Sequence, residues 1–385
     1  MFRAQDLTID ADFPGGNIAV ERMEGDRVWL HQEIRDTTEW WFYWQFRVCG
    51  AAGRTLSFTF TNGDVFSTRG PAVSVDGGAS WRWLGLDACE AATFTYAFGP
   101  DAGSVRFCFA IPYQGSDLAA FLARIGDHPD LRTDVLCRTH KGRDVEVLYL
   151  GPDRDPRYRV LMTARHHACE SIASYVLEGL MCEVLADREI GRWLREHVQL
   201  MVVPFVDKDG VEAGDQGKSR DPHDPNRDYG TYVDPTAPSL YAVPAALREQ
   251  VPAWSEGKLR MALDFHCPWI RGEHNEVVYF VGSPDKDHWA RVTAFAAVLE
   301  RVQTGPLTYH RADNLPFGEA WNTVENVTEG RPFSRWAARL PGVDVASTME
   351  IPYANVGAET VTADKARALG ADVARAIRQH LKDLA

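Results

Sequence analysis

The sequence lacks any long hydrophobic run, and this absence excludes one class of protein. No segment approaches the roughly 18 to 20 consecutive apolar residues that a membrane-spanning helix needs. The first 17 residues, MFRAQDLTIDADFPGGN, contain three aspartates and no apolar stretch, so they do not resemble a secretory signal. We therefore expect no membrane partner.

An excess of positive charge is also missing. The chain has 41 lysines and arginines against 54 aspartates and glutamates, a net charge of −13, and no basic run. Because phosphate recognition needs clustered cations, we expect no nucleic-acid partner. A local basic pocket could still bind an acidic substrate, since the net charge does not fix the sign of a single site.

Cysteine is sparse, and its pattern does not indicate disulfides. The seven cysteines are an odd number, are scattered along the chain and form no CxxC pair. This pattern is typical of reduced thiols, and together with the lack of a signal it predicts a cytoplasmic protein. The sequence indicates nothing about the oligomeric state.

The chain changes character near residue 115, which predicts two domains, 1–115 and 116–385. In the first, short runs rich in aromatic residues and threonine alternate with turn residues, as in TLSFTFTNGD, ATFTYAFGP and SVRFCFAIPY. Such runs predict an all-β antiparallel sandwich. The run WWFYWQF within it could be a stacking platform for a ligand, but we interpret it as alternating core residues of a strand.

From residue 116 onward, patterns of strands and helices alternate. We expect strands at 144–151, 157–164, 197–207, 259–267 and 276–282, and helices at 169–186 and 364–384. This alternation predicts an α/β domain with helices on both faces of a sheet. The stretch from 211 to 238 is rich in Gly, Asp, Pro and Arg, and a loop of that length is usually functional or disordered.

Two histidines and a glutamate in this second region have the spacing of a metal site. His167 and Glu170 stand three residues apart after an expected strand, and His266 ends another. Two His and one carboxylate, with a fourth position left to water, form the ligand set of a catalytic zinc. Glu350 closes the apolar run VDVASTME, and it could take a proton from that water.

The residues around these four offer the remaining parts of a hydrolytic site. Asp264 could orient the imidazole of His266, although a plain buried Asp is an equal alternative. His166 should point away from His167, so we leave it outside the metal group. The 211–238 loop supplies groups for the developing oxyanion and for the substrate, although each taken alone could be a solvated loop residue: Lys218, Arg220, Asn226 and Arg227.

In order along the chain, HHACE, DPNRDY, DFHC and STMEIPY resemble the motifs of the zinc carboxypeptidases. The segments TEWWFYWQFRV and FCFAIPYQGSDLAAFL resemble the β-sandwich that precedes the catalytic domain in the cytosolic carboxypeptidase subgroup. The resemblance implies a mixed eight-stranded catalytic sheet between helices, with one Zn²⁺ per chain at the carboxyl edge of the strands. It also implies that a peptide or protein C-terminus is the substrate.

The same resemblance implies roles for individual residues. His167, Glu170 and His266 would bind zinc, and Glu350 would be the general base. Arg220 would polarise the scissile carbonyl, while Asn226 and Arg227 would grip the terminal carboxylate. The family's mobile tyrosine is not evident, because Thr328 stands at the corresponding place and Tyr309 lies further upstream.

The substrate preference and two other functions stay open at this stage. Arg271 and Lys218 could form a cationic pocket for an acidic or branched glutamyl residue, or Arg271 could instead pair with Glu273 at the surface. Trp269 lies in the same stretch. The alternatives to a carboxypeptidase are a zinc amidohydrolase acting on small N-acyl amino acids and a non-catalytic binding protein. We expect the sandwich to shape access to the site without doing chemistry.

Overall fold

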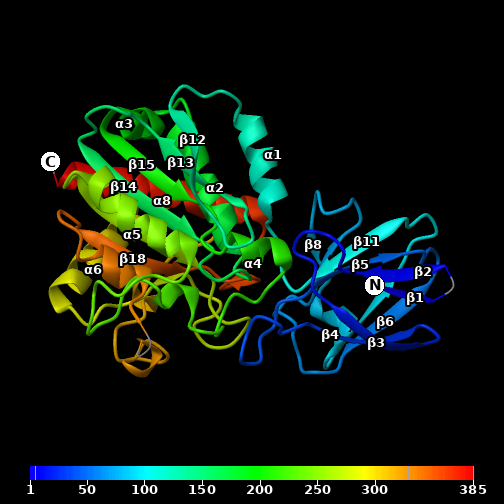
Figure 1. Ribbon diagram of the computed structural model, residues 1–385. Coiled ribbons are helices and arrows are strands. Elements are labelled where there is room, and N and C mark those ends of the chain that lie inside the picture. The colour runs from blue at the N-terminus through cyan, green and yellow to red at the C-terminus, as the bar shows by residue number, and fades with distance from the viewer. Residues whose placement is uncertain (5, 328–329, 385) are drawn as a thin grey trace.

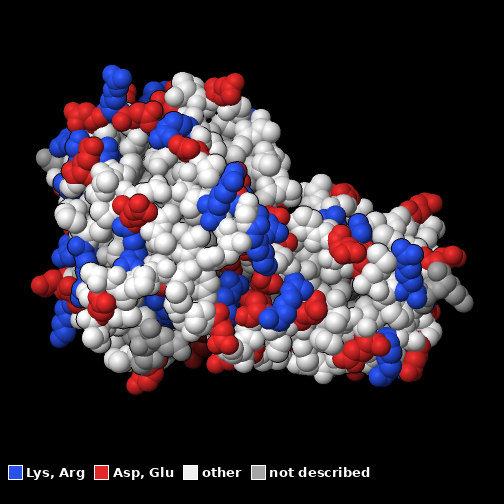
Figure 2. Space-filling model, viewed as in Figure 1, with Lys and Arg blue, Asp and Glu red and all other residues white. Residues whose placement is uncertain are grey.

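The structure is a computed structural model that describes residues 1–4, 6–327 and 330–384. Figure 1 shows two bodies side by side, a β-rich one formed by the N-terminal part and a larger one with helices around a sheet. No helix within the described residues is long and apolar enough to cross a membrane. On the face seen in Figure 2, cationic and anionic side chains are interspersed.

The N-terminal body is a sandwich of two sheets, as the sequence predicts. The first has the order β1 (Phe2–Ala4), β2 (Leu7–Asp10), β5 (Gln45–Cys49), β11 (Ser104–Cys108), β7 (Ala72–Ser74), β8 (Arg82–Trp83). The second has the order β3 (Ala19–Glu24), β4 (Arg27–His31), β6 (Thr55–Phe60), β10 (Thr93–Ala97), β9 (Cys89–Glu90), and η1 (Leu86–Ala88) precedes β9. Strand pairing is antiparallel except between β4 and β6, which run parallel.

Aromatic residues at alternate positions of the strands fill the space between the two sheets. The ring of Phe58 lies 5.3 Å from Phe46 and 4.9 Å from Phe94, measured between centroids. Phe94 in turn lies 5.2 Å from Phe107. This is the period of two expected when one face of each sheet is buried, and it explains the richness of the segment in phenylalanine.

The second body contains a mixed sheet of seven strands in the described part of the chain, one fewer than the eight implied by the resemblance. Its order is β12 (Leu131–Arg138), β13 (Asp144–Leu150), β15 (Val198–Val203), β14 (Tyr158–Ala164), β16 (Leu259–His266), β18 (Val345–Glu350), β17 (Tyr279–Phe280). The four central strands β15, β14, β16 and β18 are parallel. Apart from Arg260 in β16, every residue of these strands is buried, as expected for parallel strands covered on both faces.

Helices cover both faces of this sheet. One face carries α2 (Ile172–Leu185), α3 (Glu189–His197), α6 (Lys286–Val302) and α8 (Ala363–Asp383). The other carries α5 (Ala242–Ser255) and α7 (Phe333–Ala337). Shorter elements connect these parts: α1 (Gly115–Ile125), α4 (Lys208–Ala213), η2 (Pro225–Arg227), η3 (Arg311–Asp313), η4 (Glu325–Val327), β19 (Asn355–Val356) and β20 (Glu359–Thr360).

The two bodies share a continuous hydrophobic core. Buried aromatic residues join the sandwich core to the face of the mixed sheet that carries α2, and Phe109 lies 5.0 Å from Tyr353 between ring centroids. The last sandwich strand ends at Cys108 and α1 begins at Gly115. The domain boundary at residue 115 stays a prediction.

Candidate active site

The candidate site lies where the central parallel strands end. His266 and Glu350 are the last residues of β16 and β18, and they are paired in the strand register. The turn between β14 and α2 adds His167 and Glu170. Because parallel strands end at one edge of the sheet, residues about 180 positions apart in sequence meet there.

A buried arginine holds the turn that carries two of these side chains. Arg165, at the end of β14, has a φ of 63° and donates from Nε to the carbonyl oxygen of Ala168 at 3.1 Å. It also donates from Nη1 to Tyr113 O at 2.7 Å and to Ser174 Oγ at 3.1 Å. The guanidinium group therefore supports the turn from inside, and it ties that turn to the start of α1 and to α2.

Three side chains converge with ligand atoms facing one another. Glu170 Oε1 lies 2.7 Å from His167 Nδ1, and Glu170 Oε2 lies 2.7 Å from His266 Nδ1. The two Nδ1 atoms are 3.2 Å apart. All three side chains are buried. A divalent cation would satisfy this set, so the residues present fit a zinc ion held by two imidazoles and a carboxylate.

Two aspartates orient the imidazoles of this group. Asp224 Oδ1 lies 3.0 Å from His167 Nε2, and Asp264 Oδ2 lies 2.6 Å from His266 Nε2. In each ring this leaves Nδ1 facing the shared centre. Burial acts to raise the pKa of both aspartates, but the neighbouring histidines outweigh it, and the pKa of each is lowered. Both therefore remain anionic beside the rings they hold.

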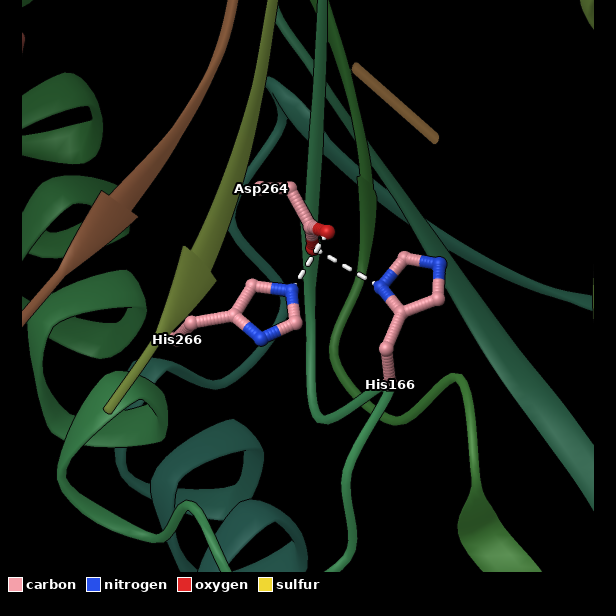
Figure 3. A group of neighbouring side chains, drawn as sticks. All are labelled: His166, Asp264 and His266. Carbon is pink, nitrogen blue, oxygen red and sulfur yellow. Dashed lines mark hydrogen bonds and ion pairs between the residues drawn. The ribbon is translucent and has the colours of Figure 1, made fainter. Parts of the chain in front are cut away.

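Asp264 also binds His166, as Figure 3 shows, with the carboxylate lying between the two imidazole rings. His166 Nδ1 lies 2.8 Å from Asp264 Oδ1, and its Nε2 lies 2.7 Å from the hydroxyl of Tyr229. Thr163 donates to the same carboxylate oxygen at 2.8 Å. Although these three residues could also surround an ion, both nitrogens of His166 and both oxygens of Asp264 already have partners. We interpret the group as the support of His266.

Glu350 lies beside this group in a dry environment. Its side chain is buried, and Oε2 has no hydrogen-bond donor within the part of the chain that the structure describes. Burial raises the pKa of Glu350 to about 7, and the nearby Glu170 adds to the rise against the opposing charges of His266 and Lys218. A bound metal ion would act in the opposite direction. A carboxyl group whose pKa lies near neutrality can both accept and return a proton.

These catalytic groups face a cavity of about 240 Å³ between the two bodies. Its walls are mostly apolar, with five aromatic side chains among them, and both bodies contribute: Trp41, Phe42, His167, Glu170, Lys218, Cys267, Pro268, Trp269, Trp321, Asn326, Glu350 and Tyr353. The ring of Trp269 lies 4.5 Å from Trp41 and 5.1 Å from Phe42 between centroids.

The interpretation of WWFYWQF as one alternating strand was therefore wrong for its first half. β5 begins only at Gln45, and Trp41 and Phe42 line this cavity in an extended segment before it. Trp44 and Phe46 lie in the sandwich core, as expected. The pattern could not separate the two groups, because both are aromatic and buried.

The cations expected around the metal do not all lie together. Lys218 lines the cavity, with Nζ 3.1 Å from Asp224 Oδ2 and 3.1 Å from His167 Nε2. Arg220 does not line it, because its Nη2 pairs with Asp36 Oδ2 at 3.0 Å and with Asp207 Oδ2 at 2.9 Å.

The two residues expected to grip the terminal carboxylate lie in different places. Asn226 is buried below the metal group, where Oδ1 accepts from the backbone N–H of Phe333 at 2.9 Å and Nδ2 lies 3.2 Å from His266 Nε2. Arg227 donates from Nε and Nη2 to the carbonyl oxygen of Asn326 at 3.1 and 2.9 Å. It lines a second, polar cavity of about 350 Å³, which shares Lys218 and Asn326 with the first.

Arg271 is held by the sandwich and does not line the cavity. Its Nη1 lies 2.9 Å from Asp64 Oδ2, and its Nη2 donates to Asp64 O at 3.0 Å. This contact replaces the surface pair with Glu273 considered above. Of the two cations expected in an acidic pocket, only Lys218 is therefore at the cavity.

Of the two positions considered for a catalytic tyrosine, only one can be described. Thr328 lies outside the described residues. Tyr309 is buried, and its hydroxyl group donates to Asn314 at 2.8 Å. Tyr353 does line the cavity, and its hydroxyl oxygen lies 3.8 Å from the sulfur of Cys169.

Sequence reasoning missed three features of the site. Asp224 lies within the quoted motif DPNRDY, so its position beside two expected binding residues was an available signal. The wall formed by Trp41 and Phe42, and the pairing of Asp36 with the loop around Lys218, join residues more than 170 positions apart. No local pattern could reveal those contacts.

At the carboxyl edge of the mixed sheet, two histidines and one glutamate form a buried group with the donor atoms of a metal site. The family description "Zinc carboxypeptidase" matches residues 118–251, and "Cytosolic carboxypeptidase N-terminal domain" matches residues 9–109. The chain is therefore similar to the zinc carboxypeptidase family in its second body and to the cytosolic carboxypeptidase N-terminal domain in its first.

Similar proteins agree with these two matches. Cytosolic carboxypeptidase 2 of Mus musculus is 25% identical over 219 residues, which are 54% of this chain and 25% of that protein. Cytosolic carboxypeptidase 6 of Caenorhabditis elegans is 24% identical over 272 residues, 62% of this chain and 57% of that protein. The chain thus spans only about a quarter of the mouse protein and little more than half of the nematode one.

Solved structures share the fold over nearly the whole chain. A metallo-carboxypeptidase from Burkholderia cenocepacia has a TM-score of 0.80 at 22% identity, covering 99% of this chain and 100% of that one. A metallo-carboxypeptidase from Pseudomonas aeruginosa, in complex with (2-guanidinoethylmercapto)succinic acid, has a TM-score of 0.77 at 21% identity, covering 98% and 100%.

Proposed function

We propose that this chain is a zinc-dependent metallocarboxypeptidase that removes residues from the C-termini of peptides or proteins. The observation that carries the proposal is the buried group of His167, Glu170 and His266, which shares a cavity with Glu350. One zinc ion per chain would be held by these three ligands. A cytoplasmic location is part of the proposal, and the word cytosolic in the names of the relatives supports it.

The residues of this chain would divide the reaction between them. When bound, zinc supplies Lewis acidity for the scissile carbonyl and for the attacking water. Glu350 takes one proton from that water as its oxygen bonds to the carbonyl carbon. The same carboxyl then returns a proton to the leaving nitrogen as the C–N bond breaks, giving a shortened peptide acid and a free amino acid. Arg227 would receive the terminal carboxylate, which its planar guanidinium group can bind through two oxygens.

An acidic or branched glutamyl preference is not part of this proposal. Arg271 is tied to Asp64 away from the cavity, and the walls near Glu350 are aromatic. Such walls favour an apolar side chain next to the scissile bond, because they cannot replace the hydration of a carboxylate.

The test is turnover of a peptide panel with the metal content quantified, for the native chain and for Glu350→Gln. We expect about one zinc per chain, release of single C-terminal residues, and a kcat lowered by about 10²- to 10⁴-fold in the variant with zinc retained. Glu183→Gln is the matched control, because Glu183 is a buried glutamate paired with Arg188 elsewhere.

Other outcomes would redirect the proposal. Bound zinc with hydrolysis of small N-acyl amino acids, and none of peptides, would favour the amidohydrolase. Bound zinc without any turnover would favour a binding protein. If the protein bound no zinc, neither the carboxypeptidase nor the amidohydrolase could be maintained. Only the binding protein would then remain.

A further inference from the structure

The loop at residues 213–220 is built against the sandwich. Both oxygens of Asp36 accept backbone N–H groups, from Gln216 at 2.9 Å and from Gly217 at 2.8 Å. Arg220 completes the contact by pairing with the same carboxylate. One aspartate of the first body therefore fixes two consecutive peptide groups of the second body.

Further contacts hold the loop on either side of Asp36. The side chain of Gln216 accepts from the backbone N–H of Tyr43 at 2.7 Å and donates to the carbonyl oxygen of Tyr43 at 2.9 Å, in the manner of a strand partner. Thr38 donates to Ser219 O from its backbone N–H at 2.9 Å and from its hydroxyl at 2.7 Å. Gln216 is fully buried, so its bonds to Tyr43 are shielded from water.

The other side of the loop packs against the turn that carries His167 and Glu170. The backbone N–H of Cys169 donates to Gln216 O at 3.2 Å. Gly217 packs so closely that a Cβ there would lie 2.1 Å from the backbone nitrogen of Ala168. The loop is thus wedged between the sandwich and the segment from His167 to Glu170.

Lys218 directly follows Gln216 and Gly217 in the chain, and the contacts of these two residues determine its position. Its ammonium group lies 3.1 Å from Asp224, which also holds His167, and it lines the cavity with Glu350. Arg220, the cation expected to polarise the carbonyl, forms ion pairs with Asp36 and Asp207 instead. Of the described residues that line this cavity, Lys218 is the only lysine or arginine.

Resting on the proposed peptidase function, we propose that Lys218 is the catalytic cation that stabilises the oxyanion formed at the scissile carbonyl, and that Asp36 of the sandwich is its positioning residue. A preorganised cation in a water-poor cavity is effective because it need not reorient when charge develops. Lysine supplies a point charge, whereas an arginine would supply a planar fork. In this proposal Asp36 contacts no reacting atom. The sandwich acts on catalysis through the 213–220 loop.

Kinetic measurements on variants test the lysine. Lys218→Met should lower kcat by about 10²- to 10³-fold, with KM, zinc content and melting temperature close to native values. Lys218→Arg should restore part of the loss, and added propylammonium should rescue Lys218→Ala in a saturable manner. Lys208→Met is the control, because Lys208 pairs with Glu146 outside the cavity. A kcat within threefold of native for Lys218→Met would overturn this role.

A second variant tests the positioning residue. Asp36→Asn keeps the shape but presents an amide donor to one of the two N–H groups, so we expect kcat to fall by about 10- to 100-fold with little change in KM. Propylammonium should not rescue it, because the lysine is still present. Asp10→Asn is the control, since Asp10 is a buried sandwich aspartate paired with Arg47. Equal kcat in the two variants would contradict the proposal for Asp36.

Binding of a peptide phosphonate, an analogue of the tetrahedral anion, separates this inference from the proposed function. Calorimetry should show native protein binding the phosphonate about 10²-fold more tightly than Lys218→Met does, and both binding the product peptide equally. If native protein cleaves peptides but the two affinities match, only the inference fails. If the zinc-loaded native protein neither cleaves peptides nor binds the phosphonate, the proposed function and this inference fail together.

Discussion

At the scale of single residues, the metal group depends on side chains that do not themselves bind the ion. Asp224 and Asp264 each fix one imidazole so that Nδ1 points to the common centre. Asp264 is in turn held by Thr163 and His166. Each of the two histidines thus has a second contact that sets its rotamer and tautomer, and this reduces the conformational freedom lost on metal binding.

The contribution of Asp264 can be measured directly. Asp264→Asn removes the charge that orients His266, so we expect zinc affinity to fall by about 10- to 100-fold in a competitive chelator titration. Asp344→Asn is a matched control, because Asp344 contacts His380 at 2.8 Å far from the metal group. Unchanged affinity in Asp264→Asn would mean that the orientation of His266 comes from strand β16 alone.

Gly217 shows how closely the loop and the turn approach each other. Gly217 and Gly53 have similar φ angles of 76° and 71°, but nothing lies within 4 Å of a Cβ at Gly53. Gly53→Ala should cost about 1 to 2 kcal/mol of unfolding free energy from the backbone conformation alone. Gly217→Ala should cost more and should also lower zinc occupancy, because Ala168 must move. Equal losses for the two variants in urea unfolding would show that the loop yields without disturbing the turn.

At the scale of elements, the segment before β5 serves both bodies. Residues 36–43 bind the 213–220 loop through backbone and side chain, and Trp41 and Phe42 of the same segment form a wall of the catalytic cavity. A single extended segment therefore sets the position of a cation and the chemistry of a substrate pocket. This goes further than the expected role of the sandwich in shaping access.

Trp41 should influence which peptides are cleaved. Trp41→Ala removes apolar surface worth about 1.5 to 3 kcal/mol when buried by a substrate side chain, so kcat/KM for peptides with leucine or phenylalanine beside the scissile bond should fall by about 10- to 100-fold. Peptides with glutamate there should be poor substrates of both proteins. Trp29→Ala, which removes a tryptophan stacked on Arg22 in the second sandwich sheet, should leave the panel unchanged. A native preference for glutamate over leucine and phenylalanine would contradict this interpretation of the cavity.

At the scale of the whole molecule, the two bodies behave as one folding unit. Their cores are continuous through Phe42, Phe109 and Tyr353, and the bonds around Gln216 and Asp36 are formed across the junction. An interface that is both apolar and hydrogen-bonded resists relative motion of the parts. The candidate site is assembled at this junction, so its geometry depends on both.

Removing the sandwich should therefore abolish activity. A fragment of residues 116–385 exposes the aromatic junction and frees the 213–220 loop, so we expect an insoluble protein, or a soluble one with little turnover and reduced zinc content. Zinc analysis and the peptide assay on the soluble fraction check this. A soluble, fully active fragment would show that the sandwich contributes nothing to the site.

The sequence by itself determined the local parts of this protein. The apolar patterns located β13, β14, β15 and β16 to within a few residues, and Glu350 was recognised at the end of an apolar run that forms β18. The parallel strands among them are apolar because both of their faces are covered. His167, Glu170, His266 and Glu350 were recognisable because each stands at the end of such a strand or just after it. Strand ends of a parallel sheet meet at one edge, so their convergence follows from the topology.

Only the tertiary structure decided how the loop and the sandwich complete the site. Arg220 and Lys218 are equally plausible cations in the sequence, and they differ only because Asp36, some 180 positions away, pairs with the arginine. Contacts between distant segments also explain why WWFYWQF is divided between the core and the cavity. They explain as well why Arg271 pairs with Asp64 and does not line the cavity. Contacts between distant segments leave no periodicity or spacing in the chain, because they depend on how two independently patterned bodies pack together.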